Sequence, residues 1–223
     1  MIKRPSPNFN QRPVGSTVDM LVLHYTGMPS AEDALARLCD PVAEVSAHYV
    51  IDEDGSTYLL VIEEHRAWHA GVAAWQGNTN INDRSIGIEL VNPGHEFGYR
   101  SFSDVQMTTL VSLAGEIISR HSIAARNVVG HSDVAPTRKQ DPGELFDWAR
   151  LADQGVGLWP ESDTAENLST DFGAALEQYG YDIADLAAAT TAFQRHFRPA
   201  ICDGVADAET LNILQDLLNQ SGH

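Results

Sequence analysis

Short runs of bulky apolar residues alternate along the chain with segments of helical periodicity. Residues 18–24 contain a short, bulky apolar run, which is typical of a buried strand in the middle of a sheet. Residues 85–91 have the pattern of another strand, and residues 127–130 have that of a short one. Residues 47–52 and 57–62 have the pattern of two further strands. The four residues between them include a glycine and predict a hairpin turn.

Two segments between these strands have the pattern of capped helices. Ser30 followed by Asp33 is a typical helix start, and an apolar face that includes Leu35 and Leu38 follows it. Ser103 can cap a longer helix, in which apolar residues recur about once per turn up to residue 118. Strands and helices that intermix in this way predict an α/β fold, with a mixed central β-sheet flanked by helices.

The composition changes after residue 160. Residues 161–169 are polar and resemble a linker, and the helical patterns beyond them span about 60 residues, which is near the lower size limit of an independent unit. We therefore expect a main domain at residues 15–160 and a small C-terminal three-helix domain at residues 170–220. The three helical patterns lie at residues 172–179, 183–197 and 207–218.

The chain of 223 residues is strongly acidic. It has 31 Asp and Glu against 14 Lys and Arg, which gives a formal net charge of −17 at pH 7. Such a chain is a poor partner for nucleic acids and anionic lipids, and it has no apolar run long enough to predict membrane insertion. Cys39 and Cys202 lie far apart and outside any CxxC pair, so we expect free thiols, with one disulfide as the alternative.

The N-terminal residues give an expectation about the compartment. Their basic residues are not followed by an apolar run, so they lack the pattern of a secretory signal peptide. We therefore expect a cytoplasmic protein, with a periplasmic one as the alternative if a leader has been removed. A monomer is the default expectation for the oligomeric state.

Three side chains at or after strand ends are candidate metal ligands. His24 ends one apolar run, His131 directly follows another, and Asp141 lies ten residues later in a loop with a proline and a glycine. Two imidazoles and one carboxylate suit a catalytic zinc ion that keeps a fourth position open for water. The spacing matches no compact metal motif, so structural roles for these residues are an alternative on spacing alone.

Two further residues could supply proton-transfer and oxyanion chemistry. Glu89 is an acid flanked by apolar residues on a strand. It is either a solvated carboxylate at a sheet edge or a proton-transfer group with a raised pKa. Lys139 is one of only two lysines in the chain and lies two residues before Asp141. It could stabilise an oxyanion, or it could be an ordinary surface lysine.

Six segments in order carry a recognisable pattern: LVLHYT at 21–26, VSAHYV at 45–50, AWHAG at 67–71, SIGIEL at 85–90, VVGHSDVAP at 128–136 and RKQDPG at 138–143. Together they resemble the zinc-dependent N-acetylmuramoyl-L-alanine amidases of the type-2 amidase family, which share their fold with the peptidoglycan recognition proteins. The resemblance covers about residues 15–160. The segments YGYD, AFQRHFRP and DGVADAET after residue 178 are similar to the small three-helix peptidoglycan-binding domain, and this combination is typical of the AmiD-like branch.

The resemblance implies a role for each candidate residue. His24, His131 and Asp141 stand at the positions of the family's zinc ligands. Glu89 matches the catalytic glutamate, and Lys139 matches the basic residue that stabilises the transition state. The implied reaction is hydrolysis of the amide between the lactyl group of N-acetylmuramic acid and L-alanine, with peptidoglycan or a muropeptide as the substrate and Zn²⁺ as the cofactor.

Other residues are candidates for substrate contact. Trp68 and His69 are expected to line the substrate groove, although core packing is an alternative for Trp68 and for Trp75. Arg84 either binds a carboxylate of the stem peptide or forms a surface salt bridge. His48 is also a candidate near the substrate, but a histidine in mid-strand is more often a packing residue.

Two alternatives concern the activity and its setting. The first is a non-catalytic peptidoglycan receptor or sensor of the same fold, although such proteins have lost a zinc ligand and this chain has all three positions filled. The second concerns the task, because a cytoplasmic enzyme would recycle anhydro-muropeptides whereas an exported one would trim the wall. The C-terminal helices would either bind glycan strands or brace the catalytic domain.

Overall fold

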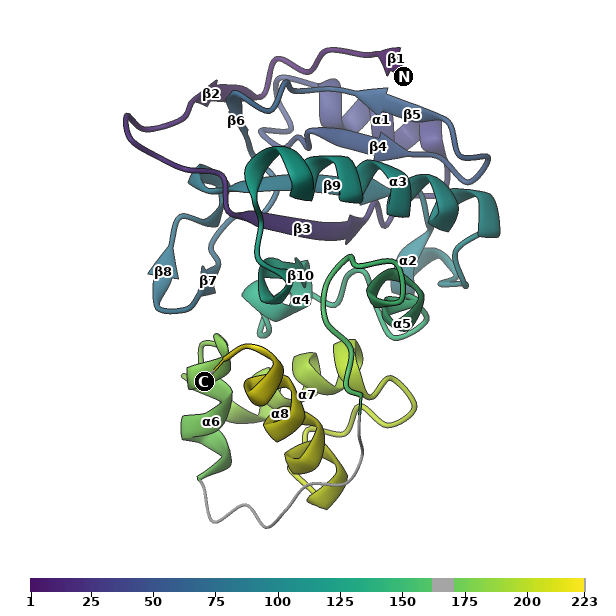
Figure 1. Cartoon of the computed structure of the whole chain (residues 1–223). Coiled ribbons are helices and arrows are strands. Elements are labelled where there is room, and N and C mark those ends of the chain that lie inside the picture. Colours follow the sequence, from purple (N-terminus) through teal and green to yellow (C-terminus); the bar gives the residue numbers. More distant parts are fainter. Residues whose placement is uncertain (162–170, 223) are drawn as a thin grey trace.

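The computed structural model describes residues 1–161 and 171–222, and the segment predicted to be a linker lies almost entirely outside this range. A six-stranded sheet in the order β1-β5-β4-β9-β3-β10 forms the centre (Figure 1). Neighbouring strands among β4, β9, β3 and β10 are parallel, whereas β4 and β5 form the predicted antiparallel hairpin. The strands are β1 (Ile2–Lys3), β3 (Met20–Tyr25), β4 (Tyr49–Ile51), β5 (Thr57–Leu59), β9 (Ser85–Leu90) and β10 (Val128–Gly130).

Side chains of β3 alternate between the two faces of the sheet, because successive residues of a strand point in opposite directions. Leu21 and Leu23 pack with α3 (Asp104–His121) and α5 (Trp148–Ala152) on one face. Met20, Val22 and His24 are therefore directed to the opposite face. Ser103 caps α3 as predicted, since its side chain accepts a hydrogen bond from the backbone N–H of Gln106.

Helices cover both faces of the sheet, as predicted. The helix α1 (Ala31–Cys39) lies on the side opposite α3 (Figure 1) and packs Leu35 and Leu38 against Val50 of β4. Its predicted cap Ser30 accepts a hydrogen bond from the N–H of Asp33. The shorter elements are β2 (Phe9–Gln11) paired with β6 (His65–Ala67), β7 (Ala74–Trp75) paired with β8 (Asn78–Thr79), η1 (Ile81–Asp83), α2 (Gly94–Phe97), η2 (Ala125–Asn127) and α4 (His131–Val134).

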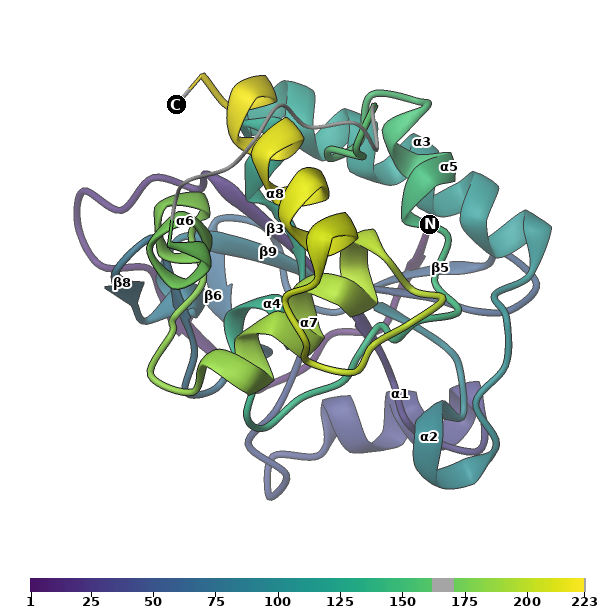
Figure 2. The ribbon, with the colours of Figure 1, turned by 90° about the horizontal axis from the view of Figure 1, so that it is seen from below.

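Three helices follow the gap in the described residues, where three were predicted: α6 (Phe172–Tyr179), α7 (Leu186–Phe197) and α8 (Ala208–Gln220). The second begins at residue 186 rather than 183, because the Asp185 side chain caps it by accepting from the N–H of Ala188. Seen from below, α7 lies next to α4 of the main domain (Figure 2). One continuous apolar cluster joins Met20 and Trp75 of the main domain to Phe193 of α7, so the C-terminal helices share a core with the sheet.

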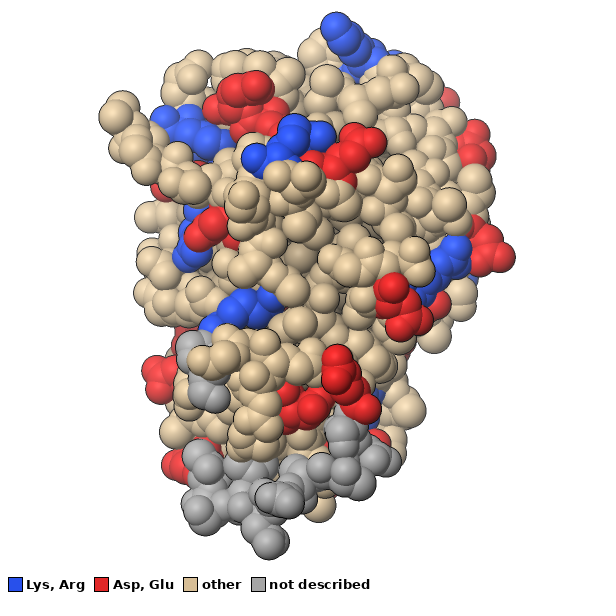
Figure 3. All heavy atoms as spheres, viewed as in Figure 1, with Lys and Arg blue, Asp and Glu red and all other residues tan. Residues whose placement is uncertain are grey.

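Acidic and basic side chains are interspersed on the face shown in Figure 3, without an extended basic area there. Cys39 and Cys202 are free thiols. Among the described residues, no helix is both long and apolar enough to cross a membrane.

Candidate metal centre and catalytic pocket

The strand register brings the predicted ligands and Glu89 to one place. His24 of β3 is paired with Glu89 of β9 in the parallel ladder, so both side chains point to the same face. Gly130 of β10 is paired with Leu23, which places His131, the first residue of α4, beside His24. The loop after α4 then returns, and the carbonyl of Asp141 accepts a hydrogen bond of 2.9 Å from the N–H of Ser132.

Three potential ligand atoms form a small buried triangle. The distance between the Nδ1 atoms of His24 and His131 is 2.9 Å, and each of these atoms lies 3.0 Å from Oδ2 of Asp141. In a tetrahedral site with bonds of about 2.0–2.1 Å, neighbouring ligand atoms are about 3.3 Å apart. The observed triangle is therefore within a few tenths of an ångström of one face of such a site.

The hydrogen bonds around the two imidazoles assign their tautomers. Nε2 of His131 lies 3.0 Å from the carbonyl of Ala70, so it carries the proton and Nδ1 is bare. The hydroxyl of Ser85 donates to a backbone carbonyl of η1 and accepts from Nε2 of His69. Nδ1 of His69 is consequently an acceptor, and Nε2 of His24 donates to it at 3.0 Å. Nδ1 of His24 is therefore bare as well.

Three acceptor atoms thus converge without a proton between them. Burial, reinforced by the neighbouring His131, lowers the pKa of His24 to about 4, so this ring is neutral near pH 7. Burial alone would raise the pKa of Asp141, but its two imidazole neighbours, His131 and His24, lower it well below its ordinary value, so this carboxylate is ionised. Two bare nitrogens and an ionised carboxylate directed at one point suit a bound cation. The donor set therefore fits the metal that the sequence predicts.

Glu89 lies beside this triangle in an environment that favours its protonated form. Burial, followed by the charge of Asp141, raises the pKa of Glu89 well above its ordinary value, and Lys139 only partly opposes this. Its Oε2 atom is buried and has no hydrogen-bond partner among residues 1–161 and 171–222. A carboxyl group whose pKa is raised in this way can both accept and return a proton.

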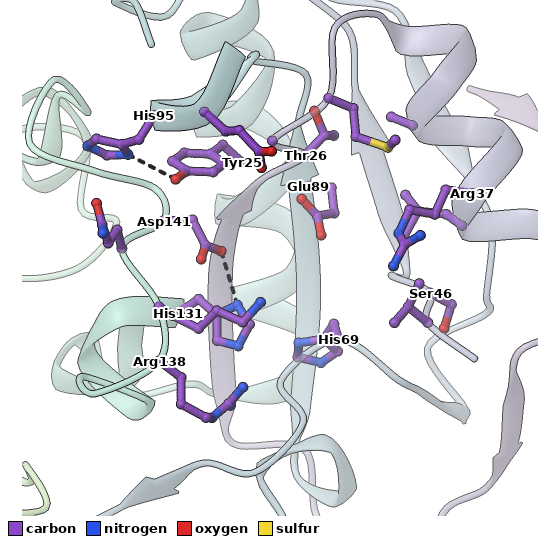
Figure 4. Close-up of a pocket in the computed structure, with 18 of the residues that line it drawn as sticks. Tyr25, Thr26, Arg37, Ser46, His69, Glu89, His95, His131, Arg138 and Asp141 are labelled. Carbon is purple, nitrogen blue, oxygen red and sulfur yellow. Dashed lines mark hydrogen bonds and ion pairs between the residues drawn. The ribbon is translucent and has the colours of Figure 1, made fainter. Parts of the chain in front are cut away.

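A pocket of about 410 Å³ opens in front of these groups. Glu89, His131 and Asp141 line it, with Lys139 beside them. Figure 4 shows Glu89 on its strand facing the space that His131 and Asp141 border from the other side. The pocket therefore gives a substrate access to the candidate metal site and to the candidate base together.

Several lining residues were not predicted from the sequence: Tyr25, Arg37, His95 and Arg138. Tyr25 directly follows His24, and Arg138 directly precedes Lys139. Their adjacency to candidate residues was therefore an available signal. Arg37 lies on the polar side of α1, where nothing in the sequence separates it from an ordinary surface arginine.

The residues predicted to contact the substrate do not all line the pocket. Trp68 and His69 both line the pocket, but the His69 ring is also the hydrogen-bond partner of His24. Arg84 is not among the pocket-lining residues and forms an ion pair with Asp19, with Nε 2.7 Å from Oδ1. The structure favours the salt-bridge interpretation of Arg84.

Two other candidates have packing roles in the described structure. His48 is buried, and its Nδ1 accepts a hydrogen bond of 2.9 Å from the N–H of Gly87. Trp75 belongs to the core that the sheet shares with the C-terminal helices. Gly87 also makes room for the metal-side network, because a Cβ atom there would lie 2.5 Å from Cγ of His69.

The family model described as N-acetylmuramoyl-L-alanine amidase matches residues 14–144. The chain belongs to this family. It is 39% identical over 234 aligned positions to the N-acetylmuramoyl-L-alanine amidase AmiD of Escherichia coli, covering 92% of this chain and 84% of that one. It is 38% identical to the 1,6-anhydro-N-acetylmuramyl-L-alanine amidase AmpD of Citrobacter freundii, over 66% of this chain and 86% of AmpD.

Solved structures of amidases extend the similarity over nearly the whole chain. The complex of E. coli AmiD with anhydro-N-acetylmuramic acid-L-Ala-D-γ-Glu-L-Lys superposes with a TM-score of 0.81 and 37% identity, covering 96% of this chain and 94% of AmiD. AmpDh3 of Pseudomonas aeruginosa, in complex with anhydromuramic pentapeptide, has a TM-score of 0.83 and 35% identity, with 95% of each chain covered. The predicted mixed-sheet amidase fold is confirmed, and the family match favours the catalytic interpretation over the receptor.

Proposed function

We propose that this protein is a zinc-dependent amidase that hydrolyses the bond between the lactyl group of N-acetylmuramic acid and L-alanine in peptidoglycan or muropeptides. The observation that carries the proposal is the convergence of three bare acceptor atoms, from His24, His131 and Asp141, next to Glu89, whose Oε2 has no hydrogen-bond partner in the described part of the chain. The relatives AmiD and AmpD bear the names of amidases of this class, and AmiD was crystallised with an anhydro-muropeptide described as its substrate.

His24, His131 and Asp141 would hold the metal, and a set of two nitrogens and one oxygen is typical of zinc sites with three protein ligands. A zinc ion bound there would lower the pKa of a water ligand and polarise a substrate carbonyl. His69 and the Ala70 carbonyl fix the orientation of the two imidazoles by accepting their Nε2 protons.

Glu89 and Lys139 would carry out the proton transfer and the charge stabilisation. The Glu89 carboxylate removes a proton from the attacking water as its oxygen bonds to the lactyl carbonyl carbon. The protonated Glu89 then donates that proton to the nitrogen of L-alanine as the C–N bond breaks, so one water is consumed and a carboxylic acid and an amine are formed. The Lys139 ammonium, which lines the same pocket, stabilises the negative charge on the carbonyl oxygen.

The pocket contains cations that can bind the carboxylates of a substrate. Arg37, Arg138 and Lys139 line it together with three acidic residues, in a chain whose formal charge is −17. A stem peptide carries free carboxylates, which these cations would attract. Trp68 offers an aromatic surface at the same pocket for a sugar ring or a peptide.

The receptor alternative is disfavoured, because all three ligand positions are filled and two of them, His131 and Asp141, line the same pocket as Glu89. The cytoplasmic location and the monomeric state stay predictions from the sequence. Relative rates on soluble anhydro-muropeptide and on intact sacculi would show whether the protein recycles fragments or trims the wall.

Digestion of a purified muropeptide, followed by mass spectrometry, tests the proposal. We expect release of a stem peptide that begins with L-alanine, its loss after treatment with a chelator, and its recovery on addition of Zn²⁺. Cleavage at another bond, or undiminished cleavage in the chelated protein, would contradict the proposal.

A further inference from the structure

The side chain of Asp133 is held mainly by residues from the C-terminal helices. Asp133 lies in α4, two residues after the candidate ligand His131, and is 1% exposed. Its carboxylate accepts three hydrogen bonds of 2.7 Å, from the N–H of Gly130, the hydroxyl of Tyr181 and Nδ1 of His196. Two of these three donors are 48 and 63 residues further along the chain, in the loop after α6 and in α7.

The imidazole of His196 is fixed from two directions. A carboxylate can only accept, so Nδ1 of His196 carries the proton of the bond to Asp133. The ring also stacks on Trp148 of α5, with centroids 3.7 Å apart and planes 20° from parallel. His196 is itself buried. These contacts hold this part of α7 against α5 and against α4, the helix that begins with the candidate metal ligand His131.

The neighbouring residue of α7 makes a second connection to the pocket. Arg195 forms an ion pair of 3.5 Å with Glu144. Glu144 lies 3.2 Å from Nε2 of His95, and Nδ1 of His95 lies 2.9 Å from the hydroxyl of Tyr25. Tyr25 directly follows His24 and lines the pocket, as does His95 (Figure 4). Two adjacent residues of α7, His196 and Arg195, are thus linked through side-chain contacts to the helix that begins with His131 and to the residue that follows His24.

We propose that the C-terminal helices are a positioning element of the metal centre, in which Tyr181 and His196 hold Asp133 and thereby fix α4 and His131. The proposal rests on the metal site proposed above. A helix of four residues cannot maintain its own geometry, so the orientation of His131 depends on the contacts that hold α4. Hydrogen bonds to an ionised carboxylate are among the stronger ones available for this purpose.

The test is the zinc affinity of full-length variants, measured by competition with a chromogenic chelator. Tyr181→Phe removes one hydroxyl and leaves the ring in place, and it should weaken zinc binding about tenfold, as substitutions behind a metal ligand typically do. Tyr179→Phe is the matched control. It removes the hydroxyl of a buried tyrosine in the same unit that has no hydrogen bond to Asp133, and it should leave the affinity unchanged.

A pair of substitutions at His196 separates positioning from packing. His196→Leu should weaken zinc binding as Tyr181→Phe does, whereas His196→Asn keeps an N–H donor near the position of Nδ1 and should recover most of the affinity. In the metal-free proteins, amide hydrogen exchange at residues 128–135 should be faster in Tyr181→Phe than in Tyr179→Phe.

Several outcomes would overturn the proposal. One is native zinc affinity in Tyr181→Phe, and another is an equal loss in Tyr179→Phe, since that would indicate general destabilisation. If His196→Leu does not fold, Tyr181→Phe decides alone. Failure of the native protein itself to bind zinc would refute the metal site rather than the role of the C-terminal helices.

Discussion

Replacement of Glu89 by Gln should change turnover and stability in opposite directions. Gln has nearly the same shape as Glu but cannot take the proton of the attacking water. Acid–base groups contribute about 10²–10⁴-fold to rate, which corresponds to about 3–5 kcal/mol of activation free energy. Glu89 does not belong to the three-ligand group, so the variant should retain zinc while it loses most of its turnover.

The stability effect follows from the raised pKa of Glu89. Its ordinary pKa is 4.5, and burial and the charge of Asp141 raise it well above that value in the folded, metal-free protein. The unfolded chain releases this proton at a lower pH than the folded chain, so folding becomes less favourable as the pH rises above 4.5. Gln removes this penalty, and the metal-free variant should be more stable than the native protein at pH 7, by about 1.4 kcal/mol for each pH unit between 4.5 and the raised pKa. At pH 4 the difference should disappear.

Two assays on the same preparations test this reasoning. Turnover of a soluble muropeptide is measured by mass spectrometry with zinc present, and urea unfolding is measured with a chelator at pH 4 and pH 7. Glu64→Gln is the control, because Glu64 is exposed, and we expect it to change neither quantity. Near-native turnover of Glu89→Gln would refute its role as the base, and lower stability at pH 7 would refute the account of its raised pKa.

Three further predictions concern the ligands, the network behind them and a remote ion pair. His131→Ala should lose both bound zinc and turnover; metal content after dialysis measures this, and native zinc content would contradict it. Gly87→Ala places a Cβ 2.5 Å from Cγ of His69. It should therefore displace that ring, weaken zinc binding about tenfold and lower stability by about 1–3 kcal/mol; unchanged values in chelator competition and urea unfolding would be the contrary result. Burial would raise the pKa of Glu63, but hydrogen bonds from a guanidinium, a phenol and an imidazole lower it to about 2. The ionised Glu63 carboxylate therefore makes its full contribution to the free energy of unfolding above pH 4.5, and this contribution is lost as the pH falls towards 2. Glu63→Gln should cost about 1–2 kcal/mol at pH 7 and less at pH 3, and an equal cost at both would contradict this reasoning.

Much of the catalytic half could be predicted from the sequence because its signals are local. The apolar run that became β3 is buried on both faces of the sheet, which is why it reads as a continuous run. The caps Ser30 and Ser103 act within three residues of themselves. His24 and His131 could be singled out because each ends or follows an apolar strand, and the family resemblance supplied the grouping with Asp141 that spacing alone did not.

The remaining features depend on contacts between distant parts of the chain. Arg84 pairs with Asp19 across 65 positions, and local sequence could not choose between this ion pair and a substrate contact. The role of Asp133 could not be predicted locally, because its partners Tyr181 and His196 lie in the C-terminal part of the chain that was expected to form a separate unit. His69 was expected to contact substrate, and its bond to His24 depends on the position of the loop after β6, which the local sequence does not determine.

Hydrolysis of a purified anhydro-muropeptide in water enriched in ¹⁸O tests the central claim most directly. If the zinc-loaded protein directs water to the lactyl carbonyl, one ¹⁸O atom should enter the new carboxyl group of the muramic acid product. The peptide that begins with L-alanine should gain none, and a chelated sample should give neither product. Label in the peptide, or no cleavage by protein with zinc bound at the site of His24, His131 and Asp141, would contradict the account.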